Sequence, residues 1–191
     1  ATLGADVPYF LQGGTVLGLD RGDLLYPLVD YPAAWVVLVV PRFGVSTAEA
    51  YRWWDEEGGP DKARPTSLED RGRTLSGPAF RSGPPSDLRN DLQDPVAAHH
   101  PEIARIIGAL RKAGAFHAAM SGSGSAVFGL FSHRPAAERA ARALGKSGAR
   151  ALVSRTVNRA AYQRLVGIPA NRISLPFAPR SPGHSSGSAS S

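Results

Sequence analysis

The sequence predicts an α+β fold, and three observations support this prediction. Two apolar runs of strand length, Phe116–Met120 and Ala126–Phe131, flank a short loop of Gly and Ser residues. A third run, Trp35–Val40, is apolar on both faces, as expected for a strand in the interior of a sheet. Pro101–Ala113 has its isoleucines and a leucine at the spacing of an amphipathic helix, which Gly114 ends. A chain of 191 residues is long enough for one domain with a real core and part of another.

Shorter patterned segments complete the expected order of elements. They are a short helix or extended segment at Tyr9–Leu11, strands at Thr15–Leu19 and Leu24–Leu28, a helix opened by the capping box Ser46–Glu49 and running to about Trp54, a helical stretch from Asn90 to His99, a helix at Pro135–Leu144 ended by Gly145, a strand at Ala149–Val157 and a helix at Asn158–Leu165. Gly, Pro, Ser and charged residues dominate 56–87, which predicts a flexible insertion. Residues 166–191 lose all pattern, and we expect a disordered tail.

Composition narrows the class of protein. The formal net charge is +6 and the sequence pI is about 10.2, which suggests phosphorylated or nucleic-acid ligands. The arginines are scattered and do not alternate with aromatic residues, so nucleic-acid binding is the minority interpretation. No apolar run approaches the ~18–20 residues of a membrane helix, so we expect no membrane partner. The lack of cysteine excludes disulfides, thiolate metal sites and a cysteine nucleophile, and it fits a cytoplasmic protein.

The Ser121–Ser125 loop is the first candidate site. Gly122 and Gly124 can take positive φ, so the loop can fold back and direct several backbone N–H groups at one spot. Such a spot suits an anion, usually a phosphate. A plain hairpin turn built from small residues is the equally weighted alternative.

Asp6 is the second candidate, an acidic residue in apolar surroundings just before Val7-Pro8. Pro8 suits the first turn of a helix, so Asp6 is interpreted either as a helix N-cap or as a general base in a cleft. Local chemistry alone favours the cap.

Aromatic and histidine residues form two further groups. The aromatic side chains of the helix after Ser46 are Tyr51, Trp53 and Trp54, which could be core or could line a pocket for a flat ring. Core is the favoured interpretation for each one singly.

No metal site is expected at His99-His100, because adjacent side chains on a helix project in different directions.

Five segments in this order resemble the C-terminal two-thirds of a small-molecule kinase of the GHMP superfamily. They are LGADVPYFL, GGTVLG, VSTAEAY, NDL and MSGSGSAVFGLF, and they cover about Leu3 to Leu165. The resemblance implies that 1–30 is the end of an N-terminal, ribosomal-S5-like nucleotide-binding domain. It also implies a C-terminal domain at 31–165, including the 56–87 insertion, in which helices cover one face of an antiparallel sheet.

The resemblance also implies a role for each candidate site residue. Asp6 falls on the aspartate taken as the catalytic base, which reverses the preference from local chemistry. Thr47 and Tyr51 fall near positions that hold the substrate. The other candidate site residues form the phosphate-side glycine loop: Ser121, Gly122, Ser123 and Gly124.

The implied activity is transfer of the γ-phosphoryl group of ATP, with Mg²⁺, to a small-molecule alcohol. Within the superfamily, the resemblance carried by LGADVP followed by GGTVLG implies a substrate in which cytidine diphosphate is linked to methylerythritol and which is phosphorylated on its 2-hydroxyl. We also expect a monomer or weak homodimer. The family's lysine-bearing strand and ATP-wrapping glycine-rich loop have no counterpart here, and the chain begins within a patterned segment without Met. We therefore expect a fragment that is nearly inactive alone. The alternatives are a homoserine- or mevalonate-type kinase, or a non-catalytic binding domain on the same scaffold.

Overall fold

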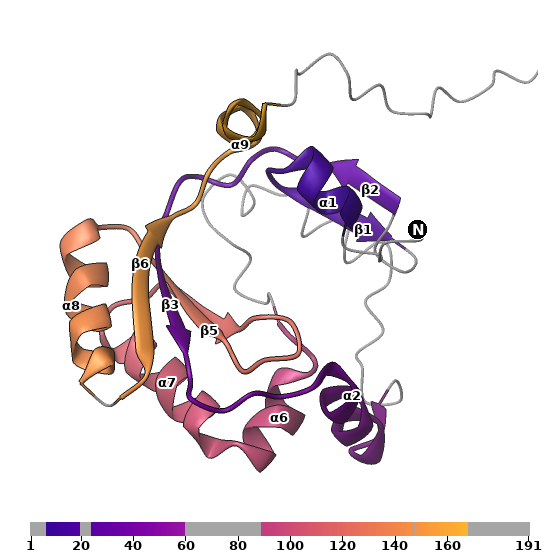
Figure 1. Ribbon diagram of the computed structural model, residues 1–191, viewed down its shortest axis with the longest axis vertical. Coiled ribbons are helices and arrows are strands. Elements are labelled where there is room, and N and C mark those ends of the chain that lie inside the picture. Colours follow the sequence, from indigo (N-terminus) through magenta and orange to yellow (C-terminus); the bar gives the residue numbers. More distant parts are fainter. Residues whose placement is uncertain (1–6, 20–23, 60–88, 147, 168–191) are drawn as a thin grey trace, which may run out of the picture.

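The computed structural model describes residues 7–19, 24–59, 89–146 and 148–167. Figure 1 shows helices gathered beside one sheet, with a smaller group of elements at one end. The elements are α1 (Val7–Gln12), β1 (Val16–Leu19), β2 (Leu24–Pro27), β3 (Trp35–Val40), α2 (Thr47–Glu56), α6 (Gln93–His99), α7 (Pro101–Lys112), β4 (His117–Met120), β5 (Val127–Phe131), α8 (Arg134–Gly145), β6 (Arg150–Arg155) and α9 (Arg159–Val166).

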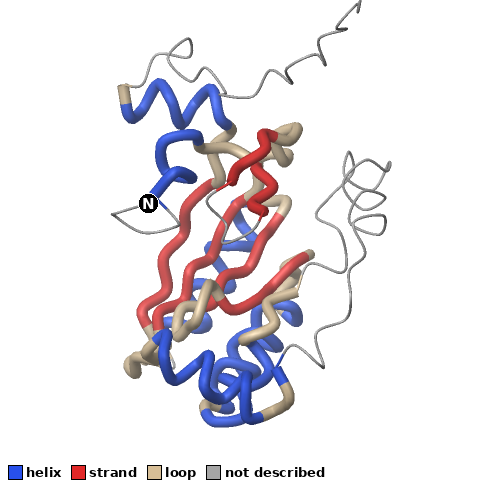
Figure 2. Tube along the Cα trace, turned by 90° about the vertical axis from the view of Figure 1, so that its right-hand side faces the viewer, coloured by secondary structure: helices blue, strands red, loops and turns tan. Residues whose placement is uncertain are grey.

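The main sheet has four antiparallel strands in the order β4-β5-β3-β6 (Figure 2). Trp35–Val40 pairs with β5 on one side and with β6 on the other, which confirms that it is an interior strand. Its side chains alternate as a strand requires: Val37 and Val39 are fully buried, whereas Val40 is exposed. The predicted run is therefore fully buried on one face only.

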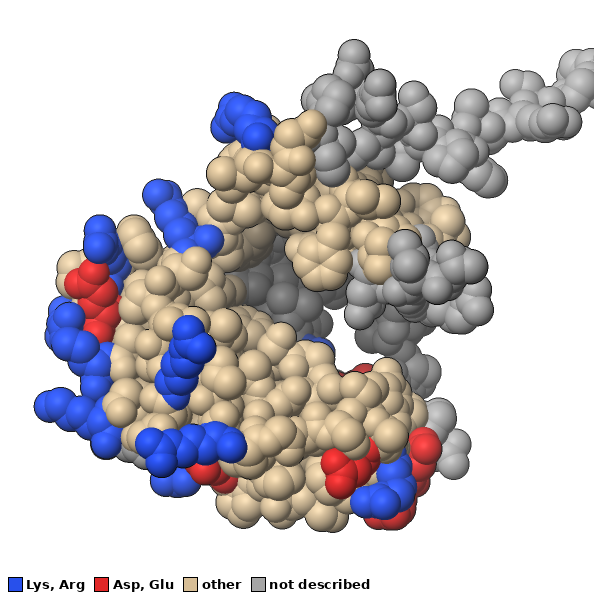
Figure 3. Space-filling view, in the orientation of Figure 1, with Lys and Arg blue, Asp and Glu red and all other residues tan. Residues whose placement is uncertain are grey.

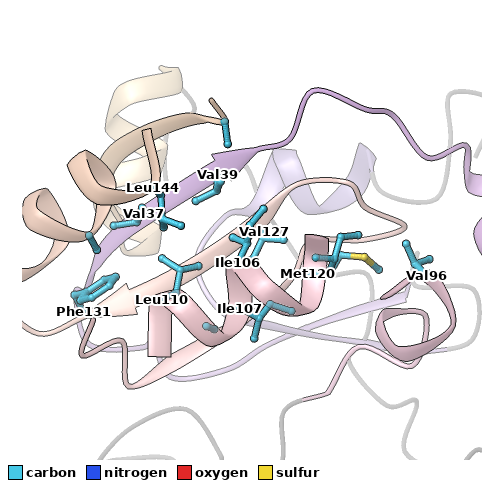
Figure 4. Packing of buried hydrophobic residues seen from close by; sticks show 14 of the residues in the cluster. Val37, Val39, Val96, Ile106, Ile107, Leu110, Met120, Val127, Phe131 and Leu144 are labelled. Atoms are coloured by element: carbon cyan, nitrogen blue, oxygen red, sulfur yellow. The ribbon is translucent and has the colours of Figure 1, made fainter. Parts of the chain in front are cut away.

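Helices cover that buried face. α7 packs on β4 and β5, and α8 packs on β3 and β6. The predicted amphipathic stripe of α7 is confirmed, because all four of its apolar residues are buried: Ile103, Ile106, Ile107 and Leu110. They meet Val37, Val39, Val127 and Phe131 of the sheet in one core (Figure 4). This arrangement gives the α+β architecture in which helices lie on one face of an antiparallel sheet.

Small residues allow the helices to approach the sheet closely. Ala137 and Ala140 of α8 are buried against it. A Cβ on Gly129 of β5 would lie 3.0 Å from Leu110 Cδ2, so the glycine leaves room for the α7 leucine. The opposite face of the sheet carries no helix from the described part of the chain, and Ala119 and Phe128 lie on it as a cross-strand pair.

The N-terminal elements form a separate unit that α9 holds in place. β1 and β2 make a two-stranded antiparallel sheet of their own. The Arg159 guanidinium donates to the carbonyl oxygens of Gly13, Thr15 and Leu28, at 3.2, 2.6 and 3.4 Å. The Tyr162 hydroxyl donates to the Phe10 carbonyl oxygen at 2.6 Å. The C-terminal helix is thereby bonded to the chain that follows Asp6.

Element boundaries differ slightly from the predictions. The capping box is confirmed: the Ser46 hydroxyl accepts from the Glu49 N–H, and the Glu49 carboxylate accepts from the Ser46 N–H, but α2 runs to Glu56. The Ser46 hydroxyl also donates to the Glu49 carboxylate at 2.8 Å, and this bond, together with the one from the Ser46 N–H, lowers the pKa of the Glu49 carboxyl. Gly145 is the last residue of α8, and Gly148, at φ +92°, lies in the turn beyond it. Most of the predicted insertion and nearly all of the predicted tail lie outside the described residues. No helix within the described ranges is both long and apolar enough to span a membrane.

Candidate active site

The glycine loop, residues 121–125, joins β4 to β5 at one end of the sheet. The Ser121 N–H donates to the Ala126 carbonyl oxygen at 2.8 Å, and the Gly124 N–H donates to the Ser121 carbonyl oxygen at 3.0 Å. Gly122 and Gly124 have φ of +55° and +91°, so the predicted positive φ is confirmed at both. The Gly124–Ser125 peptide bond is cis.

Two amides at the tip of this loop have no acceptor. The backbone N–H groups of Gly122 and Ser123 make no hydrogen bond within the described part of the chain. Free N–H groups on successive residues of a tight turn are the donors that a backbone anion site uses. The loop therefore has the chemistry for a phosphate, although the N–H groups of Ser121 and Gly124 are used to close the turn.

Asn90 and Gln93, at the start of α6, hold the loop from one side. The Asn90 Nδ2 donates to the carbonyl oxygens of Met120 and Gly122, at 3.0 and 2.7 Å. The Gln93 Oε1 accepts from the Met120 N–H at 3.0 Å. One face of the loop is thus bonded to side chains that lie about thirty residues earlier in the sequence.

α2 holds the other side. The Thr47 Oγ1 lies 3.1 Å from the Ser123 Oγ, and the buried Ser125 hydroxyl donates to the Phe43 carbonyl oxygen. Substrate-side and phosphate-side residues implied by the resemblance therefore lie in direct contact.

A cavity of about 650 Å³ lies beside the glycine loop. A volume of this size fits a small-molecule ligand. Its lining comes from four segments: Tyr51 and Trp54 of α2, the turn Arg89–Leu92, Met120–Gly122, and the sheet residues His117, Ala119 and Phe128. The structure thus brings Tyr51 and the glycine loop to the same cavity.

The three aromatic residues of α2 divide between core and cavity. Trp53 is buried and stacks on the His99 ring at 4.2 Å between centroids, so the core interpretation is confirmed for it. That interpretation is wrong for Tyr51, which is 52% exposed and lines the cavity. Trp54 is half-buried and lines it too, with its ring edge-to-face with Tyr51 at 6.4 Å. The difference arises because α6 packs against α2 and places the His99 ring on Trp53.

His100 and His117 lie in different environments, the first against an aromatic ring and the second in the cavity wall. His100 stacks on Phe43 at 4.5 Å between ring centroids, so the rings of His99 and His100 both pack on aromatic residues. The described residues contain no group of three His, Cys, Asp or Glu side chains that could hold a metal. His117 lies on the sheet wall of the cavity, and burial together with the positive charge of Arg111 lowers the pKa of its imidazole.

Asp6 lies outside the described residues, so its place relative to the loop is not part of this geometry. For Trp54 the alternative of a pocket was open in the sequence, and the residues that sequence reasoning missed are Asn90, Gln93 and His117. A signal existed for Asn90 alone, because NDL is one of the segments that carry the resemblance.

The comparisons with known proteins agree with this fold. Residues 75–150 match the family model described as GHMP kinases C terminal. Together with the antiparallel sheet and its helices, this match shows that the chain has the α+β fold of a GHMP kinase C-terminal domain.

Within that class, one kinase stands out by sequence similarity. The chain is 40% identical over 163 residues to 4-diphosphocytidyl-2-C-methyl-D-erythritol kinase of Moorella thermoacetica, covering 82% of this chain and 55% of the relative. A crystal structure of 4-(cytidine 5'-diphospho)-2C-methyl-D-erythritol kinase superposes with a TM-score of 0.63 at 35% identity, covering 81% of this chain and 54% of that one.

A homoserine kinase from Cytophaga hutchinsonii shares the fold, with a TM-score of 0.56 at 20% identity over 80% of this chain and 50% of that one. The chain spans about half the length of the curated relatives it matches.

Proposed function

We propose that the protein to which this chain belongs is an ATP-dependent kinase. Its substrate is 4-diphosphocytidyl-2-C-methyl-D-erythritol, which it phosphorylates on the 2-hydroxyl in non-mevalonate isoprenoid precursor synthesis. The observation that carries the proposal is the shared cavity, in which a glycine loop with free amides and the aromatic side chain of Tyr51 line the same space. The similarity to kinases of this name supports the choice of substrate.

Each side of the cavity has a proposed role. The exposed ring of Tyr51 stacks on the cytosine, and Thr47 also helps to hold the cytidine diphosphate substrate. The loop formed by Ser121, Gly122, Ser123 and Gly124 faces the phosphates, where its amides stabilise developing negative charge. Phosphoryl transfer depends mainly on such positioning and charge stabilisation, so these contacts account for a large part of catalysis.

Asp6 is the proposed general base, which takes the proton from the substrate hydroxyl. It directly precedes Val7, where α1 begins, and α1 is bonded to α9 through Phe10 and Tyr162. These contacts support the proposal because they fix the helix to which the base is attached.

Mg²⁺ is the proposed companion of ATP. It binds mainly through nucleotide phosphates and water, with one or two carboxylates from the protein. The described residues contain no group of three His, Cys, Asp or Glu side chains that could hold a metal, and we assign no step to the ion. We also propose that 1–30 completes a nucleotide-binding domain and that 31–165 is the C-terminal domain. The separate β1–β2 sheet supports this division. A cytoplasmic location is proposed as well.

The test is an assay of the complete gene product with ATP and a panel of 4-diphosphocytidyl-2-C-methyl-D-erythritol, homoserine and mevalonate. We expect turnover of the cytidine-containing substrate only. The Asp6→Asn variant should lose turnover while it still binds substrate, and turnover within about tenfold of wild type would exclude an essential base. If all three substrates are inert, the non-catalytic alternative is favoured. Steeply salt-dependent RNA or DNA binding would instead favour the nucleic-acid alternative.

The basic side chains on which that last alternative depends lie away from the cavity. Lys and Arg side chains gather on the left of Figure 3, the side occupied by α8 in Figure 1. α8 contributes Arg134, Arg139 and Arg142, and Arg134 is paired with Glu138 at 2.7 Å. The helix lies on the face of the sheet opposite Phe128, so these charges do not line the cavity.

A further inference from the structure

The Asn90 side chain donates a hydrogen bond to the Gly122–Ser123 peptide group, whose N–H is the free amide of Ser123. Its Nδ2 donates to the Gly122 carbonyl oxygen at 2.7 Å, shorter than its bond to the Met120 carbonyl oxygen at 3.0 Å. In a trans peptide the C=O and N–H point in opposite directions. The Gly122–Ser123 peptide is trans, so a carbonyl held toward Asn90 directs the Ser123 N–H away from Asn90.

Packing does not enforce this orientation. A Cβ placed on Gly122 would meet no atom within 4 Å, so the tip of the loop is open. Gly122 is free to adopt either sign of φ, and a peptide next to glycine can rotate at little steric cost. Thr47 contacts the Ser123 side chain, and the Gly124 N–H closes the turn onto Ser121. Among the described residues, the bond from Asn90 is the one made to the Gly122–Ser123 peptide group itself, and it favours one orientation of that peptide.

Asn90 is itself fixed, so its amide can act as a rigid clamp. Its Oδ1 accepts from the Leu92 N–H at 3.1 Å, and its carbonyl oxygen accepts from the Gln93 N–H at 2.9 Å. Because Oδ1 is used as an acceptor, the Nδ2 side must face the loop. Gln93 holds the Met120 N–H beside it.

We propose that Asn90 is a positioning residue for phosphoryl transfer, which orients the Ser123 N–H so that it donates to the phosphate. Gln93 assists by fixing the end of β4. The proposal rests on the proposed kinase activity and adds to it the residue that keeps the anion site formed. Without this clamp the peptide can flip, which would place the Gly122 carbonyl oxygen where the donor is needed.

The informative variant is Asn90→Asp in the complete gene product. The aspartate still accepts from the Leu92 N–H and keeps the turn, but its second oxygen faces two carbonyl oxygens and repels them. We expect kcat to fall about a hundredfold, as when one donor is lost from an oxyanion site. Binding of cytidine diphosphate, measured by calorimetry on the uncharged variant Asn90→Ser, should be unchanged, because Tyr51 and Thr47 are intact and no charge is added to the cavity wall.

A second readout reports on the amide itself. In the ¹H–¹⁵N spectrum, the wild-type Ser123 amide should shift when a non-hydrolysable ATP analogue is added with Mg²⁺, and the shift should be lost in Asn90→Asp. Asn90→Ser is the backup variant, since serine can still accept from the turn N–H but is too short to reach the loop. The matched control is Asn158→Asp, because the Asn158 Oδ1 accepts from the Ala161 N–H and aspartate preserves that cap.

The outcomes separate the two proposals. A wild-type protein that does not phosphorylate the cytidine substrate overturns the proposed function. An active wild type whose folded Asn90→Asp or Asn90→Ser variant keeps kcat within about threefold overturns the role of Asn90. So does a Ser123 amide that still shifts with nucleotide in those variants. A fall in kcat together with weaker cytidine diphosphate binding indicates general loosening of the site and also overturns it.

Discussion

The hydroxyl groups of Thr47 and Ser123 lie 3.1 Å apart, although 76 residues separate them in the chain. This contact joins the first turn of α2 to the tip of the glycine loop. Tyr51 follows Thr47 by one helical turn, and it therefore lines the same cavity as Gly122. A ligand that reaches from Tyr51 to the loop would contact both segments, as a nucleotide-linked substrate with its phosphates does.

Replacing the Tyr51 ring tests the substrate side of this arrangement. We expect Tyr51→Ala to raise KM for the cytidine substrate by roughly ten- to a hundredfold, because stacking on a base contributes about 1–3 kcal/mol. The Tyr51→Phe control should retain near-normal KM, since it keeps the ring. Stability should change little, because the side chain is half exposed. Steady-state kinetics with varied substrate measures the effect, and an unchanged KM in Tyr51→Ala would exclude the stacking role.

Much of the fold could be predicted because local pattern was enough. The apolar spacing of α7 fixed which face is buried, whatever packed against it, and Ser46 with Glu49 marked the start of α2. The loop glycines were also predictable, since their need for positive φ is a local property.

The rest depended on tertiary contacts that no local pattern contains. Tyr51, Trp53 and Trp54 are chemically alike in sequence, and the position of α6 decides that Trp53 is buried. The Asn90 contacts span thirty residues and appear only when α6 lies beside β4. The side chains that hold the site together were accordingly the ones that sequence reasoning missed.

The two loop glycines should respond differently to the same substitution. Gly122→Ala places a Cβ in open space at φ +55°, so we expect about 1 kcal/mol of destabilisation from backbone strain alone. Gly124→Ala adds a clash, because its Cβ would lie 2.9 Å from the Sδ of buried Met120 at φ +91°. It should cost at least about 1 kcal/mol more. Urea unfolding of both variants measures the difference, and equal losses would contradict the packing argument.

The Arg159 contacts predict a local loss of stability. Arg159→Met removes the bonds to the Gly13, Thr15 and Leu28 carbonyl oxygens and should lower the unfolding free energy by about 2 kcal/mol. The ion pair with Asp30, at 3.9 Å, adds little to this. Hydrogen exchange should speed up at the Leu28 N–H, which donates to the Thr15 carbonyl oxygen. The control is Arg164→Met on the exposed side of the same helix. Equal protection of the Leu28 amide in both variants would argue against the role of Arg159.

His117 makes stability depend on pH in a predictable direction. Burial in the cavity wall, aided by the positive charge of Arg111, holds the imidazole pKa below its usual 6.5. The unfolded chain therefore takes up a proton at a higher pH than the folded protein does. This contribution to stability is complete above about pH 6.5 and is lost as the pH falls from there toward the lowered folded pKa.

Replacing His117 should remove this dependence of the unfolding free energy on pH. We expect the difference in unfolding free energy between wild type and His117→Gln to shift in favour of the variant as the pH falls from 7.5 to about 5. Urea unfolding at several pH values measures it, and the NMR titration of the His117 ring gives the folded pKa directly. Taking the difference between the two proteins cancels the contributions of groups that the substitution leaves unchanged. A constant difference across this range, or a ring pKa at or above 6.5, would show that the cavity wall does not disfavour the charged imidazole.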